Sequence, residues 1–405
     1  MKQLQVLQLE LAKNDPAHGE QEVLKNFDKT SVKKVRDFHK SMWGYYKPTP
    51  LVELKELAAW LGVKRIFVKD ESKRFGLKSF KALGGSYAIA CYLAKRLGKR
   101  IEDVSFDYLA SDEIRERLGR VTFATATDGN HGRGIAWMAR ILGFPSVVYM
   151  PKGSAQARLE AIAKEGAAVR ITEGNYDDTV RMLVTDAARN GWTVVQDTAW
   201  PGYEEIPLWI MQGYTTMISE ALEALPEPPT HVFAQAGVGS MAGSAQAVVA
   251  SYGYDKDPVF TILEAAAANC FFRSFEQGKM VSVGGELNTI MAGLACGEIN
   301  PLAWDIIKNY ARFCLSCRDE VAALGMRLWG NPLGDDERII AGESGAIGGG
   351  IIGLLEKYHN LKTDLELNKD SVMLLFNTEG DTFPDKYRDI VWGGFLPVEF
   401  RRRNY

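Results

Sequence analysis

The stretch Thr125-Ala-Thr-Asp-Gly-Asn-His-Gly-Arg-Gly-Ile135 gives the strongest indication of a fold and of a binding site in this chain. The apolar run before it, residues 121–124, predicts a buried strand, and residues 131–142 carry apolar side chains at helical spacing. The stretch therefore predicts a loop that joins a strand to the start of a helix. Its glycines let the backbone approach a flat ligand, while Asp128 and Asn130 place a carboxylate and an amide at the same edge.

Strand and helix patterns alternate along most of the chain, which predicts an α/β fold with two parallel-sheet domains wrapped by helices. The short units between about residues 88 and 190 suit a small inserted domain of 88–190 within a large domain made of 1–87 and 191–405. Residues 1–45 are polar with a helical pattern, and we expect them to form a covering or dimer-contacting extension. The predicted strands include 65–69, 121–124, 146–150, 168–171, 193–196, 231–235, 259–263 and 371–376.

Composition narrows the class of protein. The chain has 405 residues and a net charge of -3, so it lacks the excess of positive charge that is typical of nucleic-acid-binding proteins. No apolar run is long enough for a membrane span and no signal peptide is visible, so we expect a cytoplasmic protein. The five cysteines are few and odd in number, which favours reduced thiols. The Cys314-Leu-Ser-Cys317 spacing is typical of two metal ligands, but no second pair of Cys or His residues lies near it to complete a four-ligand site, so no metal is predicted. The sequence does not decide whether Cys270 and Cys296 form a disulfide.

Four sequence blocks, taken in order, resemble the fold-type II pyridoxal-phosphate enzymes, which have the tryptophan synthase β-like fold. Ser79-Phe-Lys-Ala-Leu-Gly-Gly85 resembles the segment with the Schiff-base lysine, and Thr127-Asp-Gly-Asn-His-Gly132 resembles the asparagine loop. Gly237-Val-Gly-Ser-Met-Ala-Gly243 resembles the phosphate loop, and Asn377-Thr-Glu-Gly-Asp381 stands where the family places the polar partner of the pyridine nitrogen. The resemblance implies pyridoxal 5'-phosphate as the cofactor, a small amino acid as the substrate and a homodimer as the assembly.

Lys81 is the candidate for the imine-forming lysine. Such a lysine needs an amine that is neutral near pH 7, and Lys81 lies between apolar residues at an expected helix start, where the helix dipole disfavours the ammonium form. A surface lysine on an amphipathic helix is the alternative for any lysine taken alone. Lys73 and Lys78 lie nearby, and the Ser-Phe-Lys register favours Lys81.

The other cofactor contacts follow from the same blocks. Asn130 would donate to the phenolic oxygen of the cofactor, as the matching asparagine does in the family, although an asparagine at that point also serves as a helix cap. Either Asn377 or Thr378 could bond the pyridine nitrogen, and a neutral partner there favours elimination over transamination. The backbone N–H groups of a Gly-rich turn between a strand and a helix would hold the phosphate. The residues of that turn are Gly237, Val238, Gly239 and Ser240.

Two aspartates indicate which substrate the enzyme would take. Asp128 replaces the usual serine of the asparagine loop, and Asp197 follows the expected strand 193–196 at the edge where open α/β sheets bind ligands. A helix cap and a turn residue are the respective alternatives. Together with Gln196-Asp197-Thr-Ala-Trp200, Asp128 makes the chain resemble the diaminopropionate ammonia-lyases. The resemblance implies α,β-elimination of 2,3-diaminopropionate, in the D form, the L form or both, to pyruvate and ammonia. We expect Lys81, Asp128 and Asp197 to be catalytic, with Thr127, Asp128 and Asp197 holding the substrate.

Three other functions remain open from the sequence. The first is a serine or threonine dehydratase, or a β-replacement synthase, of the same fold. The second is an NAD-dependent dehydrogenase that would use Gly237, Gly239 and Glu264 as a dinucleotide site, although the glycine spacing is one residue too long for that fingerprint. The third is a binding module without catalysis, which would leave Lys81, Asp128 and Asn130 with no shared purpose.

Overall fold

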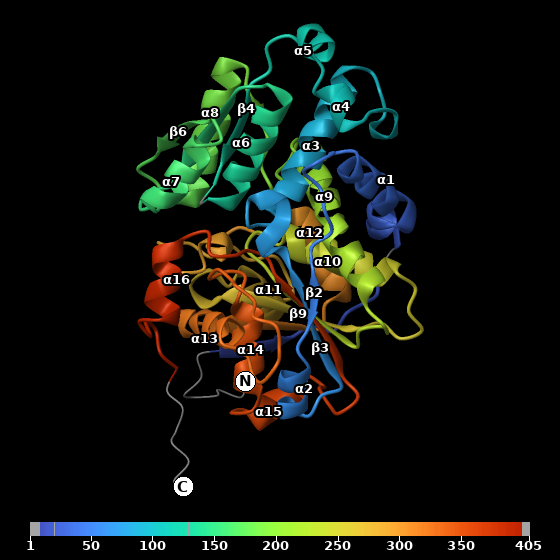
Figure 1. Ribbon diagram of the computed structural model, residues 1–405, viewed down its shortest axis with the longest axis vertical. Helices are drawn as coiled ribbons and strands as arrows, with labels where there is room; N and C mark the ends of the chain where they lie inside the picture. Colours follow the sequence, from blue (N-terminus) through green and yellow to red (C-terminus); the bar gives the residue numbers. More distant parts are fainter. Residues whose placement is uncertain (1–8, 20, 128, 399–405) are drawn as a thin grey trace.

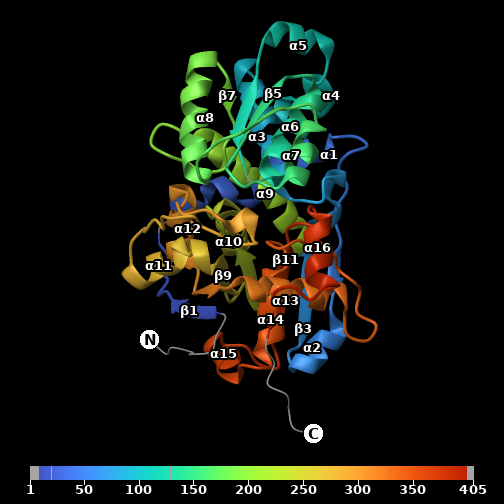
Figure 2. The same ribbon diagram turned by 90° about the vertical axis from the view of Figure 1, so that its left-hand side faces the viewer.

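A computed structural model of the chain describes residues 9–19, 21–127 and 129–398. Two β-sheets, each covered by helices, lie one above the other (Figure 1), and the same two parts are visible in the view turned by 90° (Figure 2). The upper part contains a four-stranded sheet and the lower part a seven-stranded sheet.

The seven-stranded sheet has a parallel centre and antiparallel edges. Its strands are β1 (Leu9–Lys13), β2 (Leu51–Glu53), β3 (Arg65–Asp70), β8 (His231–Gln235), β9 (Val259–Ala265), β10 (Phe313–Cys317) and β11 (Val372–Asn377). They lie in the order β1-β10-β9-β8-β11-β3-β2, and only β1 and β2 run antiparallel to their neighbours. Alternate residues enter different cores: Leu374 packs into one hydrophobic cluster and Leu375 into the other. Both faces are therefore buried, as expected for a parallel sheet covered by helices.

The expectation of a wholly helical segment over residues 1–45 was wrong for residues 9–13. These residues form β1, which pairs antiparallel with β10, so that Leu9 lies opposite Cys317 and Lys13 opposite Phe313. Long-range pairing with an edge strand decides this conformation, and a local helical pattern carries no information about it. Helical structure follows later in the segment, as η1 (Gln21–Phe27) and α1 (Lys29–Lys40).

The four-stranded sheet is parallel throughout. Its strands are β4 (Phe123–Ala126), β5 (Ser146–Met150), β6 (Ala168–Ile171) and β7 (Thr193–Val194), in the order β6-β5-β4-β7. Three of these strands fall inside the range 88–190, whereas β7 lies just beyond it. The division into a large domain of 1–87 and 191–405 and a small domain of 88–190 stays a prediction, and β7 favours moving its second boundary towards residue 195.

Helices cover both sheets. The helices in the upper part of Figure 1, which contains the small sheet, include α4 (Phe106–Leu109), α5 (Asp112–Leu118), α6 (Asn130–Leu142), α7 (Gln156–Ala163) and α8 (Tyr176–Asn190). The others are α2 (Lys55–Leu61), α3 (Lys81–Arg96), α9 (Glu205–Ala224), α10 (Ser240–Ser251), α11 (Cys270–Gln277), α12 (Pro301–Tyr310), α13 (Asp319–Gly330), α14 (Ile347–Leu355), α15 (His359–Asp364) and α16 (Pro384–Val391). Short 3-10 turns lie at η2 (Glu71–Gly76), η3 (Ile101–Asp103), η4 (Ala266–Ala268) and η5 (Ala292–Leu294). Within the described residues, no helix combines the length and apolar character that a membrane crossing requires.

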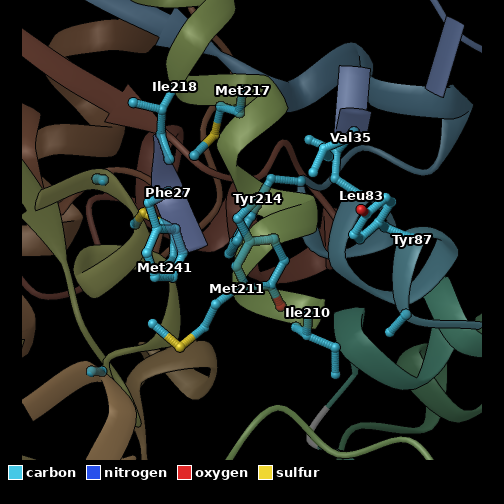
Figure 3. Packing of buried hydrophobic residues seen from close by; sticks show 14 of the residues in the cluster. Phe27, Val35, Leu83, Tyr87, Ile210, Met211, Tyr214, Met217, Ile218 and Met241 are labelled. Carbon is cyan, nitrogen blue, oxygen red and sulfur yellow. The ribbon is translucent and has the colours of Figure 1, made fainter. Parts of the chain in front are cut away.

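The packing of α3 against α9 fixes the position of Lys81, the first residue of α3. A β-carbon at Gly213 of α9 would lie 2.5 Å from the backbone oxygen of Leu83, so glycine is needed at this crossing. Figure 3 shows Leu83 beside Tyr214 in this buried interface, in which every labelled side chain belongs to one hydrophobic cluster. Because two helices in such close contact cannot shift independently, the start of α3 is held rigidly.

Candidate functional site

One cavity collects residues from the ends of strands in both sheets. The segments that follow β4, β7, β8 and β11 all contribute to its wall, together with the start of α3. Of the residues predicted from the sequence, the cavity is lined by Lys81, Thr127, Asn130, Asp197, Gly237, Val238, Gly239, Ser240 and Thr378. Asp128 lies outside the described residues. The sequence-based prediction therefore names a set of residues that the fold brings together from positions far apart in the chain.

Lys81 and Asp197 form the charged centre of the cavity. Lys81 Nζ lies 2.5 Å from Asp197 Oδ2, and the two side chains are 19% and 4% exposed. Burial alone would raise the pKa of Asp197, but the Lys81 ammonium and the neighbouring His131 lower it to about 2. Asp197 is therefore ionised at any working pH. Its carboxylate favours the ammonium form of Lys81, whereas the start of α3 disfavours it, so these two influences oppose each other.

Two further side chains lie beside Asp197. His131 Nε2 lies 2.9 Å from the backbone oxygen of Val195, so the ring proton belongs on Nε2 and Nδ1 faces Asp197 at 4.0 Å. Burial lowers the pKa of His131, the nearby Lys81 charge lowers it further, and the Asp197 carboxylate opposes this shift. The Tyr176 hydroxyl donates to Asp197 Oδ1 at 3.4 Å. Neither His131 nor Tyr176 was predicted as a site residue, and only the fold brings the start of α8 to this point.

The asparagine loop is held in a tight turn between β4 and α6. Thr127 Oγ1 accepts hydrogen bonds from the backbone N–H groups of Gly129, at 2.9 Å, and Gly132, at 3.1 Å. A β-carbon at Gly132 would lie 2.3 Å from the Thr127 side chain, so this turn admits only glycine there. Thr127 was expected to bind substrate, and in this structure its hydroxyl is already engaged in shaping the loop.

Asn130 contacts the segment that follows β11. Its side-chain amide donates to the Glu379 carboxylate, whose other oxygen accepts the backbone N–H of Ser344 at 3.0 Å. Glu379 is 3% exposed and lines the cavity. The sequence contained it within the block 377–381, but nothing in its spacing indicated a contact with Asn130.

The predicted phosphate loop has the geometry of an anion cradle. It runs from the end of β8 into the N-terminus of α10, where unpaired backbone N–H groups and the helix dipole attract an anion. Gly239 has φ of +93°, and a β-carbon there would lie 2.3 Å from the Phe271 ring. The Ser240 hydroxyl is fixed by Asn300, which donates to it at 2.8 Å, and it in turn donates to the backbone oxygen of Asp197. The turn fits a phosphate, and it connects that site to the Lys81–Asp197 pair.

The two candidates for the pyridine nitrogen lie in different places. Asn377 is fully buried, and its amide donates to Asp70 at 2.7 Å and to the backbone oxygen of Ile340 at 3.2 Å. Thr378 lines the cavity, and its Oγ1 accepts a hydrogen bond from Gln235 at 3.1 Å. The geometry favours Thr378 over Asn377 as the residue that faces a cofactor.

Glu264 does not face the cavity as a dinucleotide site would require. It is fully buried in β9, and its carboxylate accepts the backbone N–H groups of Phe271, at 2.9 Å, and Phe272, at 2.7 Å, at the start of α11. Because the Glu264 carboxylate caps a helix, it is not placed to bind a ribose. The structure therefore does not support Glu264 as the ribose-binding residue of an NAD-dependent dehydrogenase.

The cysteines singled out from the sequence are buried and form neither a metal site nor a disulfide in the part of the chain that the structure describes. Cys314 and Cys317 both lie in β10 and enter different hydrophobic clusters, so they face opposite sides of the sheet and cannot bind one metal ion together. Cys270 and Cys296 are not joined in this structure, although the Cys270 sulfur lies 3.7 Å from the backbone oxygen of Cys296.

Comparisons with known proteins agree with this geometry. Residues 42–378 match the family model described as pyridoxal-phosphate dependent enzyme. The chain is 51% identical over 395 residues to the diaminopropionate ammonia-lyase of Escherichia coli strain K12, covering 96% of this chain and 97% of that protein. The crystal structure of the Escherichia coli enzyme in complex with D-serine superimposes with a TM-score of 0.90 at 48% identity, covering 96% of this chain and 98% of that one.

A second crystal structure of that enzyme, in complex with an aminoacrylate-PLP azomethine reaction intermediate, has a TM-score of 0.89 at 47% identity and covers 96% of this chain and 98% of that one. A family match over most of the chain and this likeness in fold lead to the same conclusion as the cavity residues. The chain belongs to the fold-type II family of pyridoxal-phosphate-dependent enzymes.

Proposed function

We propose that this protein is a diaminopropionate ammonia-lyase, which eliminates ammonia from 2,3-diaminopropionate and yields pyruvate and a second ammonia after hydrolysis. The observation that carries the proposal is the buried pair of Lys81 and Asp197, 2.5 Å apart, in a cavity that also holds the anion cradle. The identity of 51% to an Escherichia coli enzyme of this name over nearly the whole chain supports the choice of substrate.

Each group of cavity residues has a separate proposed role towards the cofactor. Lys81 carries the amine that joins the cofactor, and Gly237, Val238, Gly239 and Ser240 hold its phosphate. Asn130 and Thr378, which both line the cavity, would contact the cofactor ring. Bound pyridoxal phosphate supplies the electron sink that stabilises the charge left when the Cα proton is removed. We propose Thr378 rather than Asn377 as the polar neighbour of the pyridine nitrogen, because only Thr378 lines the cavity.

Asp197 is the proposed partner of the second amino group. Asp197 is 3% exposed and its carboxylate is ionised, so it can hold an ammonium strongly once the Lys81 amine is engaged elsewhere. A substrate with a hydroxyl at the β-carbon offers no positive charge to this carboxylate. This difference favours diaminopropionate over serine and threonine. Asp128 is proposed as a second catalytic residue from the sequence resemblance alone.

We also propose a homodimer, from the family resemblance, and a cytoplasmic location, from five buried cysteines that are not joined in disulfides. Size-exclusion chromatography with light scattering tests the dimer.

The function is tested with the purified holoenzyme and a coupled assay for pyruvate. We expect a visible absorbance band from the bound cofactor and rapid pyruvate release from D- or L-diaminopropionate, with much lower kcat/KM for serine and threonine. Faster release from serine or threonine would instead identify a dehydratase, and an absent visible band would contradict the cofactor assignment.

A further inference from the structure

A second cavity adjoins the cofactor cavity. Its volume is about 380 Å³, and its lining includes Arg158 of α7, residues of the segment 286–295, Glu343 and Lys386 of α16. Tyr176 lines both cavities, and Glu343 is the chain neighbour of Ser344, which lines the cofactor cavity. In Figure 1, α7 lies directly above α16 across the junction of the two sheets, and Figure 2 shows the same neighbourhood from the side. We call this second cavity the vestibule.

Arg158 of α7 lies between the vestibule and the asparagine loop. Its side chain is 14% exposed, and a β-carbon at Gly129 would lie 3.1 Å from the Arg158 Cδ atom. The aliphatic part of Arg158 therefore packs on the loop whose residues Thr127 and Asn130 line the cofactor cavity. Arg158 lines the vestibule, which shares Tyr176 with the cofactor cavity.

The partner of Arg158 is held loosely. Glu343 Oε2 lies 3.9 Å from Arg158 Nη2, which is longer than a hydrogen bond, although the Glu343 side chain is only 4% exposed. Burial raises the pKa of Glu343 to about 7, the Arg158 charge opposes that rise, and nearby Glu379 adds to it. At this distance the two buried charges form no direct hydrogen bond with each other, so this ion pair is poorly optimised as a structural bridge.

We propose that Arg158 is a docking residue for the α-carboxylate of the incoming amino acid, and that Glu343 is the resident anion which the carboxylate displaces. A guanidinium binds a carboxylate through two parallel hydrogen bonds, a geometry that the loose pair with Glu343 does not use. The inference rests on the proposed function only for the identity of the substrate, because any α-amino acid has this carboxylate.

The test measures ligand association with the holoenzyme by stopped-flow absorbance in the visible band. The probes are 2,3-diaminopropionate, D-serine and 1,2-diaminopropane, which has both amines but no carboxylate. We expect Arg158→Ala to lower the second-order association rate constant for the two amino acids by about tenfold, because their carboxylate loses its binding partner, and not to lower that for the diamine, which has no carboxylate. Arg158→Lys should restore part of the loss.

Glu343→Gln distinguishes docking from a structural bridge. If Glu343 only occupies Arg158 in the empty enzyme, Glu343→Gln raises the association rate constant for the amino acids, in the direction opposite to Arg158→Ala. A structural ion pair would lose rate in both variants and for all three probes, which would overturn the proposal. The control is Lys152→Ala, because Lys152 lines the same cavity with a side chain that is 71% exposed and pairs with Glu173.

An equal loss in Lys152→Ala would mean general attraction by positive charge and would also overturn the docking role. Thermal unfolding midpoints establish that each variant is folded. Because association is read from absorbance, the result stands whether or not pyruvate is released. Failure of the proposed substrate would appear as absent pyruvate with D-serine association still dependent on Arg158.

Discussion

Lys81 Nζ lies 2.5 Å from Asp197 Oδ2, although the two residues belong to different parts of the fold. Lys81 begins α3, which is held by its close crossing with α9, while Asp197 follows β7 of the small sheet. The backbone oxygen of Asp197 is in turn bonded to Ser240 at the start of the anion cradle. Asp197 therefore links the small sheet both to the lysine and to the phosphate loop.

Lys81→Ala should remove the visible absorbance of the holoenzyme and lower turnover by more than about 10²-fold, the scale for loss of a catalytic base or nucleophile. The measurements are an absorbance spectrum after addition of pyridoxal phosphate and the steady-state rate of pyruvate release. Lys78→Ala is the matched control, since Lys78 is 45% exposed and pairs with Asp381. Retention of the band in Lys81→Ala and its loss in Lys78→Ala would show that the register is wrong.

Asp197→Asn should raise KM for diaminopropionate by about tenfold or more, the usual cost of losing a charged hydrogen bond, while KM for serine changes much less. Only diaminopropionate offers a second ammonium to the carboxylate. The comparison of KM for the two substrates in one variant is internally controlled for folding. Equal changes for both, with a lowered thermal midpoint, would reduce Asp197 to a residue that positions Lys81.

Glu264 should make stability depend on pH. Burial raises the pKa of Glu264 to about 7, above the value of about 4.3 expected for an unfolded glutamate. The folded state then holds its proton more tightly, so this contribution to stability is complete below about pH 4.3 and is lost as the pH rises through about 7. Glu264→Gln removes that loss and keeps an acceptor for the start of α11.

The thermal midpoint of Glu264→Gln relative to the wild type should therefore rise between pH 5 and pH 8, corresponding to a gain on the order of 1–3 kcal/mol. Other groups that titrate in this range, such as Glu343, are present in both proteins and cancel in the difference. A difference that stays constant with pH would contradict a proton-dependent role of Glu264.

Local sequence signals predicted the elements that carry the cofactor, but not the contacts between them. The strands 146–150, 168–171 and 231–235 coincide with β5, β6 and β8, because their apolar runs are short and bounded by clear turn residues. Glu379 and Arg158 could not be assigned in this way. Their roles depend on Asn130 and Glu343, which lie far away in the sequence and become neighbours only after the two sheets pack together.

The last prediction concerns stereochemistry. The Cα–H bond that breaks must stand perpendicular to the plane of the cofactor ring, so D- and L-diaminopropionate present their protons to opposite faces. A single base cannot readily reach both faces. Lys81 would reach one face through its link to the cofactor, and Asp128, part of the asparagine loop in the sequence, is the proposed base on the other. The family resemblance implies that Lys81 would serve the L-substrate and Asp128 the D-substrate.

Asp128→Asn should therefore slow elimination from D-diaminopropionate by roughly 10²-fold or more, the usual scale for removal of a general base, and should affect the L-isomer much less. Steady-state rates of pyruvate release with each pure isomer measure the ratio directly. Asparagine preserves the size and polarity of the side chain, so a capping role at the start of α6 would leave the ratio unchanged. Equal losses on the two isomers would mean that Asp128 binds or orients the substrate and does not select the proton that is removed.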